Sequence, residues 1–259
     1  MKTSRFSNWK LAVSALGATC VLLAQSPAAG RGGGLGFRFT GGGLGLANLM
    51  GKTVTGAPFS AKLTTALSRT LGNGNQIQRQ EQADVYRDSQ GRVRIDATFT
   101  EPTSAGSQTR TEITIYDPVA GYVYRLNSQN MTAVQSPIHQ RTAPANGSAP
   151  PANGQVQTQT QSLGTQTING VSATGTQLTR TIAAEAVGNT QPIQIVRVTW
   201  VATALQIPVQ VTLTDPRSGN SMMNLTNIVQ SEPSASLFVV PAGYTVTSAP
   251  GRGFGGARR

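Results

Sequence analysis

The stretch from Val198 to Val246, VTWVATALQIPVQVTLTDPRSGNSMMNLTNIVQSEPSASLFVVPAGYTV, decides the fold expected of this chain. Its clearest part runs from Ile207 to Thr214, where apolar and polar residues alternate one by one. This period of two is typical of a β-strand with one buried face. Asp215 to Gly219 has turn chemistry, so the strand predicted from Met223 to Val229 should pair antiparallel with the preceding one.

The end of the same stretch predicts a change of structure. Glu232 to Ser236 reads as a single helical turn, with Pro233 in the first-turn position that proline tolerates. The apolar run Leu237 to Val240 follows, and a closing strand begins at Tyr244.

The residues before this stretch alternate in the same way and predict further strands. They are Phe59–Leu71, Gln76–Tyr86, Arg92–Thr100, Thr109–Tyr116, Tyr122–Leu126, a strand that begins near Gln157, Val171–Ile182 and Ile193–Val201. Turn signals separate them, including Asn73-Gly74 and a type I′ turn at Asn169-Gly170, and Ala183 to Val187 predicts a short helical turn. The apolar phase changes within Ile193–Val201, which indicates a β-bulge or burial on both faces. We therefore expect an all-β fold with minor α: a single, strongly curved antiparallel sheet of about ten strands, forming an open or half barrel.

The chain divides into five segments by composition. Residues 1–29 have a basic start, an apolar run and small residues before position 29, and predict a secretory signal peptide with a signal helix. Residues 30–53 form a glycine-rich flexible leader. The β domain spans 54–248, interrupted by a disordered loop at 136–156, and residues 249–259 form a disordered Gly/Arg-rich tail. Three alternatives remain open: a retained signal anchor, lipidation at Cys20, and a split into two domains at the loop.

The charge of the chain is strongly positive, at +11. Lys2, Arg5 and Lys10 belong to the signal, so the mature chain would carry 18 basic against 10 acidic residues, a net charge of +8. Nearly all of these cations are arginines, which suit phosphate and carboxylate groups. An anionic membrane surface is a possible partner of the Arg-rich tail. The predicted signal peptide argues against nucleic acid as a partner. The alternative to any anionic partner is that the positive charge serves only to keep the protein soluble.

Catalytic chemistry finds little support in the sequence. The one histidine, His139, lies in the predicted loop, and Cys20 lies in the predicted signal, which excludes histidine-based triads, thiol catalysis and most zinc sites. GLANLMGKT has the wrong glycine spacing for a phosphate-binding loop. Carboxylates gather only at Asp84, Asp88, Asp96, Glu101 and Glu112. Because arginines alternate with them, a solvated sheet face is the simpler interpretation, and a glycosidase-like pair is the alternative. We expect no catalytic residue, no metal and no cofactor.

Several segments resemble known envelope proteins. The closing SEPSASLFVVPAGYTV, after the DPRSG turn and an LTNI strand, resembles the lipoprotein-carrier superfamily with the LolA/LolB-like fold, which includes RseB-like regulators. YRDSQGRVRID (86–96), IYDPVAGYVYRL (115–126) and SLGTQTINGVSATGTQLTRTI (162–182) resemble functionally uncharacterised exported proteins common in Acidobacteria. The resemblance covers about 54–246 and implies a concave sheet face that binds acyl chains. The long lid helix of the carriers is missing from the sequence pattern.

Three functions follow as hypotheses. The first is an exported protein of the periplasm, or of the periplasmic face of the outer membrane, that binds a lipid or lipoprotein. The second is a structural or sensory envelope protein whose sheet face contacts another protein, and the third is a carbohydrate-active enzyme. The oligomeric state is not predicted. The candidate ligand-binding residues, for which plain core is the alternative, are Leu63, Leu67, Val93, Ile95, Phe99, Ile113, Val198, Trp200, Val209, Val211 and Leu213.

Overall fold

The computed structural model describes residues 49–50, 52–103, 106–138 and 155–249. The predicted signal peptide, nearly all of the leader and of the 136–156 loop, and the tail from residue 250 lie outside these residues.

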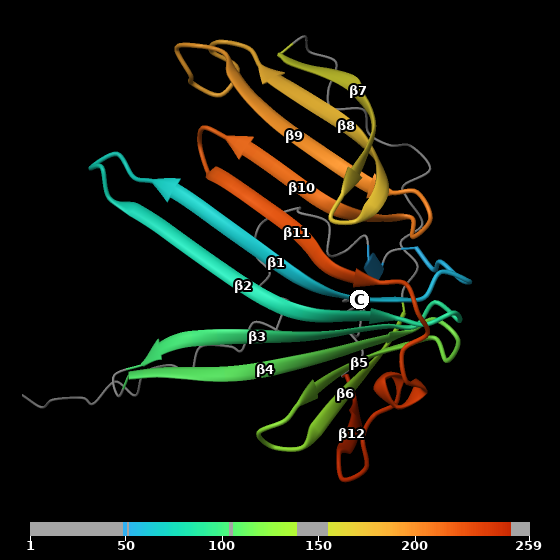
Figure 1. The fold of residues 1–259 in the computed structure, drawn as a ribbon. Coiled ribbons are helices and arrows are strands. Elements are labelled where there is room, and N and C mark those ends of the chain that lie inside the picture. Colours follow the sequence, from blue (N-terminus) through green and yellow to red (C-terminus); the bar gives the residue numbers. More distant parts are fainter. Residues whose placement is uncertain (1–48, 51, 104–105, 139–154, 250–259) are drawn as a thin grey trace, which may run out of the picture. The chain divides into compact units, whose positions relative to one another are not determined.

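The fold is all-β, as predicted, and its strands form one sheet (Figure 1). The strands are β1 (Phe59–Thr70), β2 (Gln76–Arg87), β3 (Val93–Thr103), β4 (Gly106–Asp117), β5 (Tyr122–Asn127), β6 (Thr132–Pro137), β7 (Val156–Ile168), β8 (Val171–Ile182), β9 (Ile193–Ala202), β10 (Ile207–Asp215), β11 (Gly219–Val229) and β12 (Thr245–Ser248). One short 3₁₀-helix, η1 (Ala235–Phe238), precedes β12.

Two antiparallel meanders make up the sheet. Its order is β12-β6-β5-β4-β3-β2-β1-β11-β10-β9-β8-β7, so β1 to β6 and β7 to β11 are each paired in sequence. The two meanders join where β1 pairs antiparallel with β11. Neighbouring strands in sequence pair most easily, which explains both meanders.

The prediction of a strongly curved, wholly antiparallel half barrel of about ten strands was wrong in three respects. The sheet has twelve strands, because Thr132–Pro137 pairs with β5 although its sequence hardly alternates. It is mixed, because β12 pairs parallel with β6. It is neither closed nor strongly curled: β7 and β12 are its edges, and register shifts interrupt only the pairings at Ser60/Lys62, Pro208/Gln210 and Ser162/Gly164. Strong curvature needs such bulges at repeated positions.

Of the local predictions, one turn is confirmed and three features differ in the structure. Asn169 and Gly170 both have positive φ, at 50° and 84°, as a type I′ turn requires. The helical turn expected near Pro233 begins later, at Ala235. Ala183–Val187 forms turns and no helix. Strand β9 pairs with β8 without a break, and the bulge inferred from its change of phase lies on the partner strand β10 instead.

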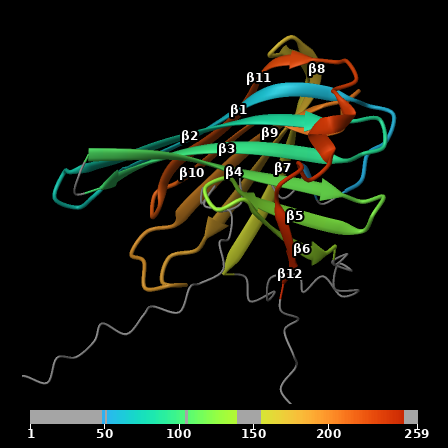
Figure 2. The ribbon, with the colours of Figure 1, turned by 90° about the horizontal axis from the view of Figure 1, so that it is seen from below.

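The C-terminal segment packs against β3 to β6 (Figure 2). Val240 and Tyr244 pack on a small core formed by Ile115, Leu126 and Ala133. The Arg94 guanidinium donates a 3.0 Å hydrogen bond from Nη1 to the carbonyl of Leu237. The sequence from Ser231 to Val246 therefore covers part of the same sheet that its neighbouring strands help to form.

The turn between β2 and β3 lies at one end of the strands, which we call the closed end. The Asp88 carboxylate accepts hydrogen bonds from the backbone N–H of Gln90 and Arg92 and from Arg92 Nε, the last at 2.6 Å. Gly91 has a φ of +82°, and a Cβ there would lie 2.8 Å from Thr53 Cγ2 and 3.1 Å from the carbonyl oxygen of Val54. The RDSQGR sequence is thus required by the packing of this turn.

Candidate functional site

Pairing register divides the side chains between two faces of the sheet, because directly opposed residues point the same way. We call them the Leu63 face and the Lys62 face, after neighbouring residues of β1. Leu63 pairs with Ala83 on β2 and Leu225 on β11, and Lys62 pairs with Asp84. Following such pairs from strand to strand assigns each paired residue of the sheet to the Leu63 face or to the Lys62 face.

The eleven candidate ligand-binding residues do not share one face. The register places most of them on the Leu63 face: Leu63, Leu67, Val93, Ile95, Phe99, Val211 and Leu213. Val209 lies at the β10 bulge and is fully buried. Ile113, Val198 and Trp200 lie on the Lys62 face. Whether any of them binds a ligand stays a prediction.

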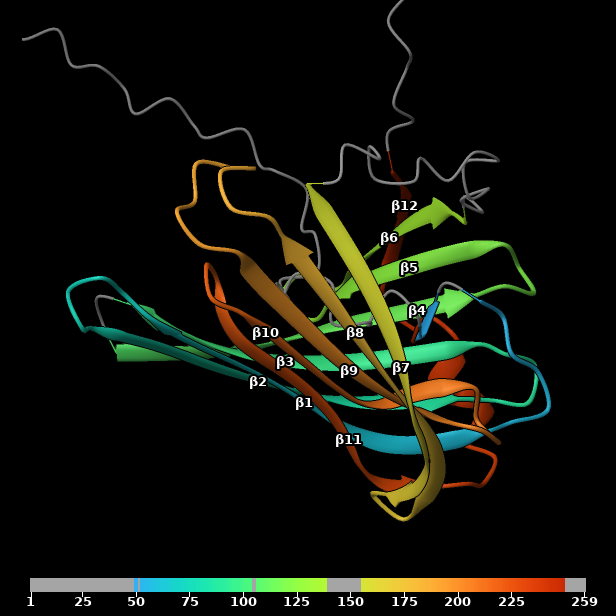
Figure 3. The same cartoon turned by 90° about the horizontal axis from the view of Figure 1, so that it is seen from above.

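Trp200 fills a structural role on the Lys62 face. It pairs directly with Gly175 of β8, and a Cβ at Gly175 would lie 2.6 Å from its ring. The indole therefore occupies the space above the glycine. The β7–β8 turn reaches over the same region to β11, because Asn169 Nδ2 donates 2.7 Å bonds to Asn224 Oδ1 and the carbonyl of Leu225 (Figure 3).

The Leu63 face carries an apolar layer over the five adjacent strands β3, β2, β1, β11 and β10. Its fully or nearly fully buried members are Leu63, Ala83, Val85, Val93, Ile95, Ala97, Val211, Met223 and Leu225. The pairs Leu63–Leu225, Val85–Ile95 and Val211–Met223 are directly opposed. Alternation predicted the buried residues of β1, β3 and β10. The sequence from Gln76 to Tyr86 reads as a polar strand at an edge or with its outer face in water, yet β2 lies between β1 and β3 and buries Ala83 and Val85.

Arg87 lies at the closed end of the Leu63 face and connects two segments of backbone there. Its guanidinium donates to the carbonyl of Ala57 from Nε and Nη2, and to the carbonyl of Leu205 at 2.7 Å from Nη2. It also lies 4.9 Å from the centre of the Phe59 ring. Burial lowers the pKa of Arg87 to about 10, so the side chain remains a cation at neutral pH.

The other end of the Leu63 face, which we call the outer rim, stays partly open. Its apolar members are half-buried or exposed: Leu67, Ile77, Leu178, Ile195 and Leu213. Leu178 and Ile77 are 38% and 37% exposed. Its basic members are Arg69, Arg79, Arg180 and Arg197. Apolar and basic groups therefore alternate where the buried layer meets solvent.

The Lys62 face differs in its charges. Lys62 Nζ lies 2.6 Å from Asp84 Oδ1, and Arg94 Nε lies 2.7 Å from Asp96 Oδ1. The hydrogen bond that Lys62 donates to the Asp84 carboxylate raises the pKa of Lys62. Burial, followed by the charges of Asp84 and Asp96, raises the pKa of Tyr86. The solvated ionic face predicted from the alternating charges holds for Asp84, whose partner Lys62 is exposed, but it is wrong for Arg94, Arg87 and Asp88, which are buried.

Asp84 and Asp96 are the carboxylates that come together. They are directly opposed in the β2–β3 pairing and line a groove of about 470 Å³. Glycoside hydrolysis needs one carboxyl as an acid and the other as a base or nucleophile, in different environments. Here each carboxylate has a cation beside it, so the pair offers no such division. Of the other carboxylates, Asp88 is held inside the turn and Glu112 is paired with Arg110.

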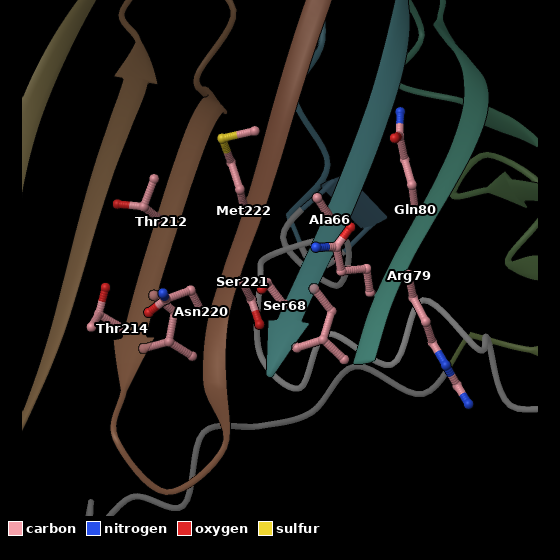
Figure 4. Close-up of a pocket in the computed structure, with 12 residues that line it drawn as sticks. Ala66, Ser68, Arg79, Gln80, Thr212, Thr214, Asn220, Ser221 and Met222 are labelled. Carbon is pink, nitrogen blue, oxygen red and sulfur yellow. The ribbon is translucent and has the colours of Figure 1, made fainter. Parts of the chain in front are cut away.

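A second groove, of about 510 Å³, crosses β10, β11, β1 and β2 (Figure 4). Two rows of opposed residues on the Lys62 face line most of it: Gln80, Ala66, Met222 and Thr212, then Gln78, Ser68, Asn220 and Thr214. Small side chains on β1 form its floor, between longer ones on β2 and β11. Arg79 also borders the groove, but its side chain extends away from it in Figure 4.

Two further properties concern only the part of the chain that the structure describes. No group of three or more histidine, cysteine, aspartate or glutamate side chains there is arranged to hold a metal ion. No helix among those residues has the length and hydropathy of a membrane-spanning segment.

Comparison with solved structures finds matches of low sequence identity and low TM-score. The MucA/MucB complex of Pseudomonas aeruginosa matches 78% of this chain and 62% of the other chain, with 10% identity and a TM-score of 0.40. The Mycobacterium tuberculosis lipoprotein LppX matches 69% of this chain at 15% identity and 90% of its own, with a TM-score of 0.27. A putative outer membrane lipoprotein-sorting domain from Vibrio parahaemolyticus matches 70% of this chain and 89% of its own, at 12% identity and a TM-score of 0.22.

The structural resemblance to MucB, LppX and lipoprotein-sorting domains is thus found again in the structure. No protein-family profile and no curated protein sequence matches the chain. With TM-scores this low the resemblance carries no weight for function, which is argued below from the residues of this chain.

Sequence reasoning missed the arginines of the outer rim. A signal was present, because Arg69 has the same parity as Leu67 on β1 and therefore the same face. Arg197 likewise has the parity opposite to Trp200 on β9. Because Trp200 was predicted to face the ligand, Arg197 was assigned to the opposite side of the sheet and its parity was not used.

Proposed function

We propose that this chain is a non-catalytic, exported envelope protein that holds a hydrophobic ligand, such as the acyl chain of a lipid or lipoprotein, on the Leu63 face. The observation that supports it is the apolar layer in register over five adjacent strands, which ends in the partly open apolar side chains of the outer rim. Since Leu63, Ile95 and Val211 are fully buried, a ligand would first contact Leu67 and Leu213 at the rim.

Localisation in the periplasm or on the periplasmic face of the outer membrane belongs to the same proposal. It rests on the basic, then apolar, then small-residue pattern of residues 1–29. The proposal also includes the five segments predicted from composition and an anionic membrane surface as a partner of the Arg-rich tail.

The test is native mass spectrometry of the full chain purified from an envelope fraction, followed by organic extraction. Co-purifying acyl-chain compounds are expected, and also uptake of added dodecyl maltoside. The double variant Leu67→Gln, Leu213→Gln should lose both, because it places amides where the hydrocarbon would pack.

The matched control is Val119→Gln. Val119 is 67% exposed, lies in the turn between β4 and β5 and borders neither groove described above, so its replacement should leave uptake unchanged. A chain of clean mass that takes up no added dodecyl maltoside would overturn the proposal. The Leu63 face would then serve as core, and a protein partner would be the function to seek.

A further inference from the structure

The outer rim holds two arginine pairs with the same geometry. Leu67 opposes Arg79 while Arg69 opposes Ile77, so Arg69 and Arg79 are diagonal neighbours on one face of β1 and β2. In the same way, Arg197 opposes Leu178 and Arg180 opposes Ile195 on β9 and β8. Diagonal residues of an antiparallel pair lie about 7–8 Å apart, within joint reach of one anionic group for side chains as long as arginine.

A continuous row of opposed residues connects the two pairs. Across the Leu63 face it reads Arg197, Leu213, Ser221, Leu67, Arg79. The arginine pairs therefore flank the two half-buried leucines where the apolar layer reaches solvent. A molecule whose hydrocarbon rests on those leucines would carry its polar end beside guanidinium groups.

These arginines differ from the cations of the Lys62 face in their partners. Arg69, Arg79, Arg180 and Arg197 make no side-chain hydrogen bond and no ion pair with other residues that the structure describes, whereas Lys62 and Arg94 are each paired with an aspartate. Among the acids whose side chains the structure describes, two face the rim. Glu81 lies one pair inward from Arg79 on β2; burial raises the pKa of its carboxyl, and the charge of Arg79 opposes that shift. Asp215 is held by Arg217. The rim therefore keeps a net positive charge.

From this arrangement we infer that the ligand of the Leu63 face is an anionic amphiphile, whose phosphate headgroup binds Arg69 with Arg79 or Arg180 with Arg197 while its chain lies on Leu67 and Leu213. The inference rests on the proposed function, since it names the chemistry of that ligand. Guanidinium groups bind phosphate oxygens through paired, charge-assisted hydrogen bonds, which a neutral headgroup cannot replace.

The experiment titrates the full chain with three probes in a calorimeter, below their micelle concentrations: dodecyl phosphate, dodecyl maltoside and inorganic phosphate. Dodecyl phosphate should bind at least about tenfold more tightly than dodecyl maltoside, because only it engages the arginines. Inorganic phosphate alone should bind far more weakly than dodecyl phosphate, since it lacks the chain.

Two double variants locate the headgroup: R69Q/R79Q and R180Q/R197Q. At least one should lower dodecyl phosphate affinity about tenfold and leave dodecyl maltoside binding unchanged. Arg125→Gln is the matched control, because Arg125 is an exposed arginine on the same face, away from the rim on β5, and should change neither affinity. All of these side chains lie at the sheet surface, and equal denaturation midpoints would show that the variants fold.

The outcomes separate the two proposals. If neither dodecyl compound binds, the proposed function fails and this inference with it. If both bind equally well and both double variants keep wild-type affinity, the hydrophobic site stands and the anionic headgroup is refuted. Inorganic phosphate binding as tightly as dodecyl phosphate would also refute the amphiphile, since the arginines would then form a plain phosphate site.

Discussion

The two ends of the Leu63 face use the same residue types for different purposes. Arg87 and Arg79 both lie on β2 and point to this face, yet Arg87 is 2% exposed and bonded to two backbone carbonyls while Arg79 is exposed without an ion pair. Leu63 and Leu67 differ in the same way on β1, as do Gly91 and Gly74 in the turns that follow. The closed end is buried and hydrogen-bonded, and the outer rim stays partly exposed. Four predictions test this contrast.

The largest difference is expected between Leu63→Ala and Leu67→Ala. Leu63 is fully buried, so its truncation should lower the free energy of unfolding by about 2–5 kcal/mol through lost burial and a cavity. Leu67 is only half-buried, and its truncation should cost about 1 kcal/mol. Urea denaturation of both variants measures this, and equal losses would show that the rim is as well packed as the layer behind it.

A similar contrast is expected for the two arginines of β2. Arg87→Met removes the donor to the carbonyls of Ala57 and Leu205, and unsatisfied buried acceptors cost about 1–3 kcal/mol each, so a loss of about 3 kcal/mol is expected. Arg79→Met should change stability by less than about 0.5 kcal/mol. Denaturation curves at one pH suffice, and a tolerant Arg87→Met variant would contradict the view that this residue holds two segments of backbone together at the closed end.

Gly74 and Gly91 have the same φ of +82° but different surroundings, so replacing each by alanine separates the cost of backbone strain from the cost of a steric clash. Gly74→Ala has nothing within 4 Å of the added Cβ, so it should cost only the strain of positive φ, about 1 kcal/mol. Gly91→Ala adds a Cβ at 2.8 Å from Thr53 and should cost about 1–2 kcal/mol more. If the thermal midpoints of the two variants fall equally, residues 53–54 do not pack on the β2–β3 turn as described.

The smallest effect concerns Asp215 at the rim end of β10. Its carboxylate accepts hydrogen bonds from Arg217, which lower the pKa of Asp215. A carboxyl with a lowered folded-state pKa stabilises the protein above its unfolded-state pKa of about 3.9, and that stability is lost as the pH falls through the folded-state value. Asp215→Asn should therefore cost about 1 kcal/mol at pH 7.

The same comparison at pH 2.5 is the control for that prediction. The cost of Asp215→Asn should shrink there, because pH 2.5 lies below the unfolded-state pKa and the stability that comes from the lowered pKa declines as the pH falls towards the folded-state value. An undiminished cost would mean that the side chain contributes by shape or by neutral hydrogen bonds.

Much of the strand pattern could be read from the sequence. Strict alternation in Ile207–Thr214 and glycine-containing turns such as Asn169-Gly170 depend on neighbours in the chain, and these predictions agree with the structure. The segment Thr132–Pro137 was missed, because it becomes a strand through pairing with β5 and β12 and carries little apolar signal of its own.

The candidate site was only partly predictable. Alternation alone predicted that Leu63, Ile95 and Val211 each lie on the apolar side of their own strand, and all three are fully buried. Trp200 could not, because its face depends on the register of β9 against β10 and β8, and β10 has a bulge next to it. The arginine pairs also depend on pairing register, because parity places each arginine on a side of its own strand but does not show which residue of the next strand lies beside it.

By itself, then, the sequence determined the strands, most turns and which residues of a strand lie on the same side, because a period of two is a local property of the backbone. Only the tertiary structure decided which side each strand turns toward its neighbours. It paired β1 with β11 and set Arg79 and Arg197 on either side of Leu67 and Leu213. The physical reason is that register is fixed by contacts between residues far apart in the chain, and a shift of one residue moves every side chain to the other face.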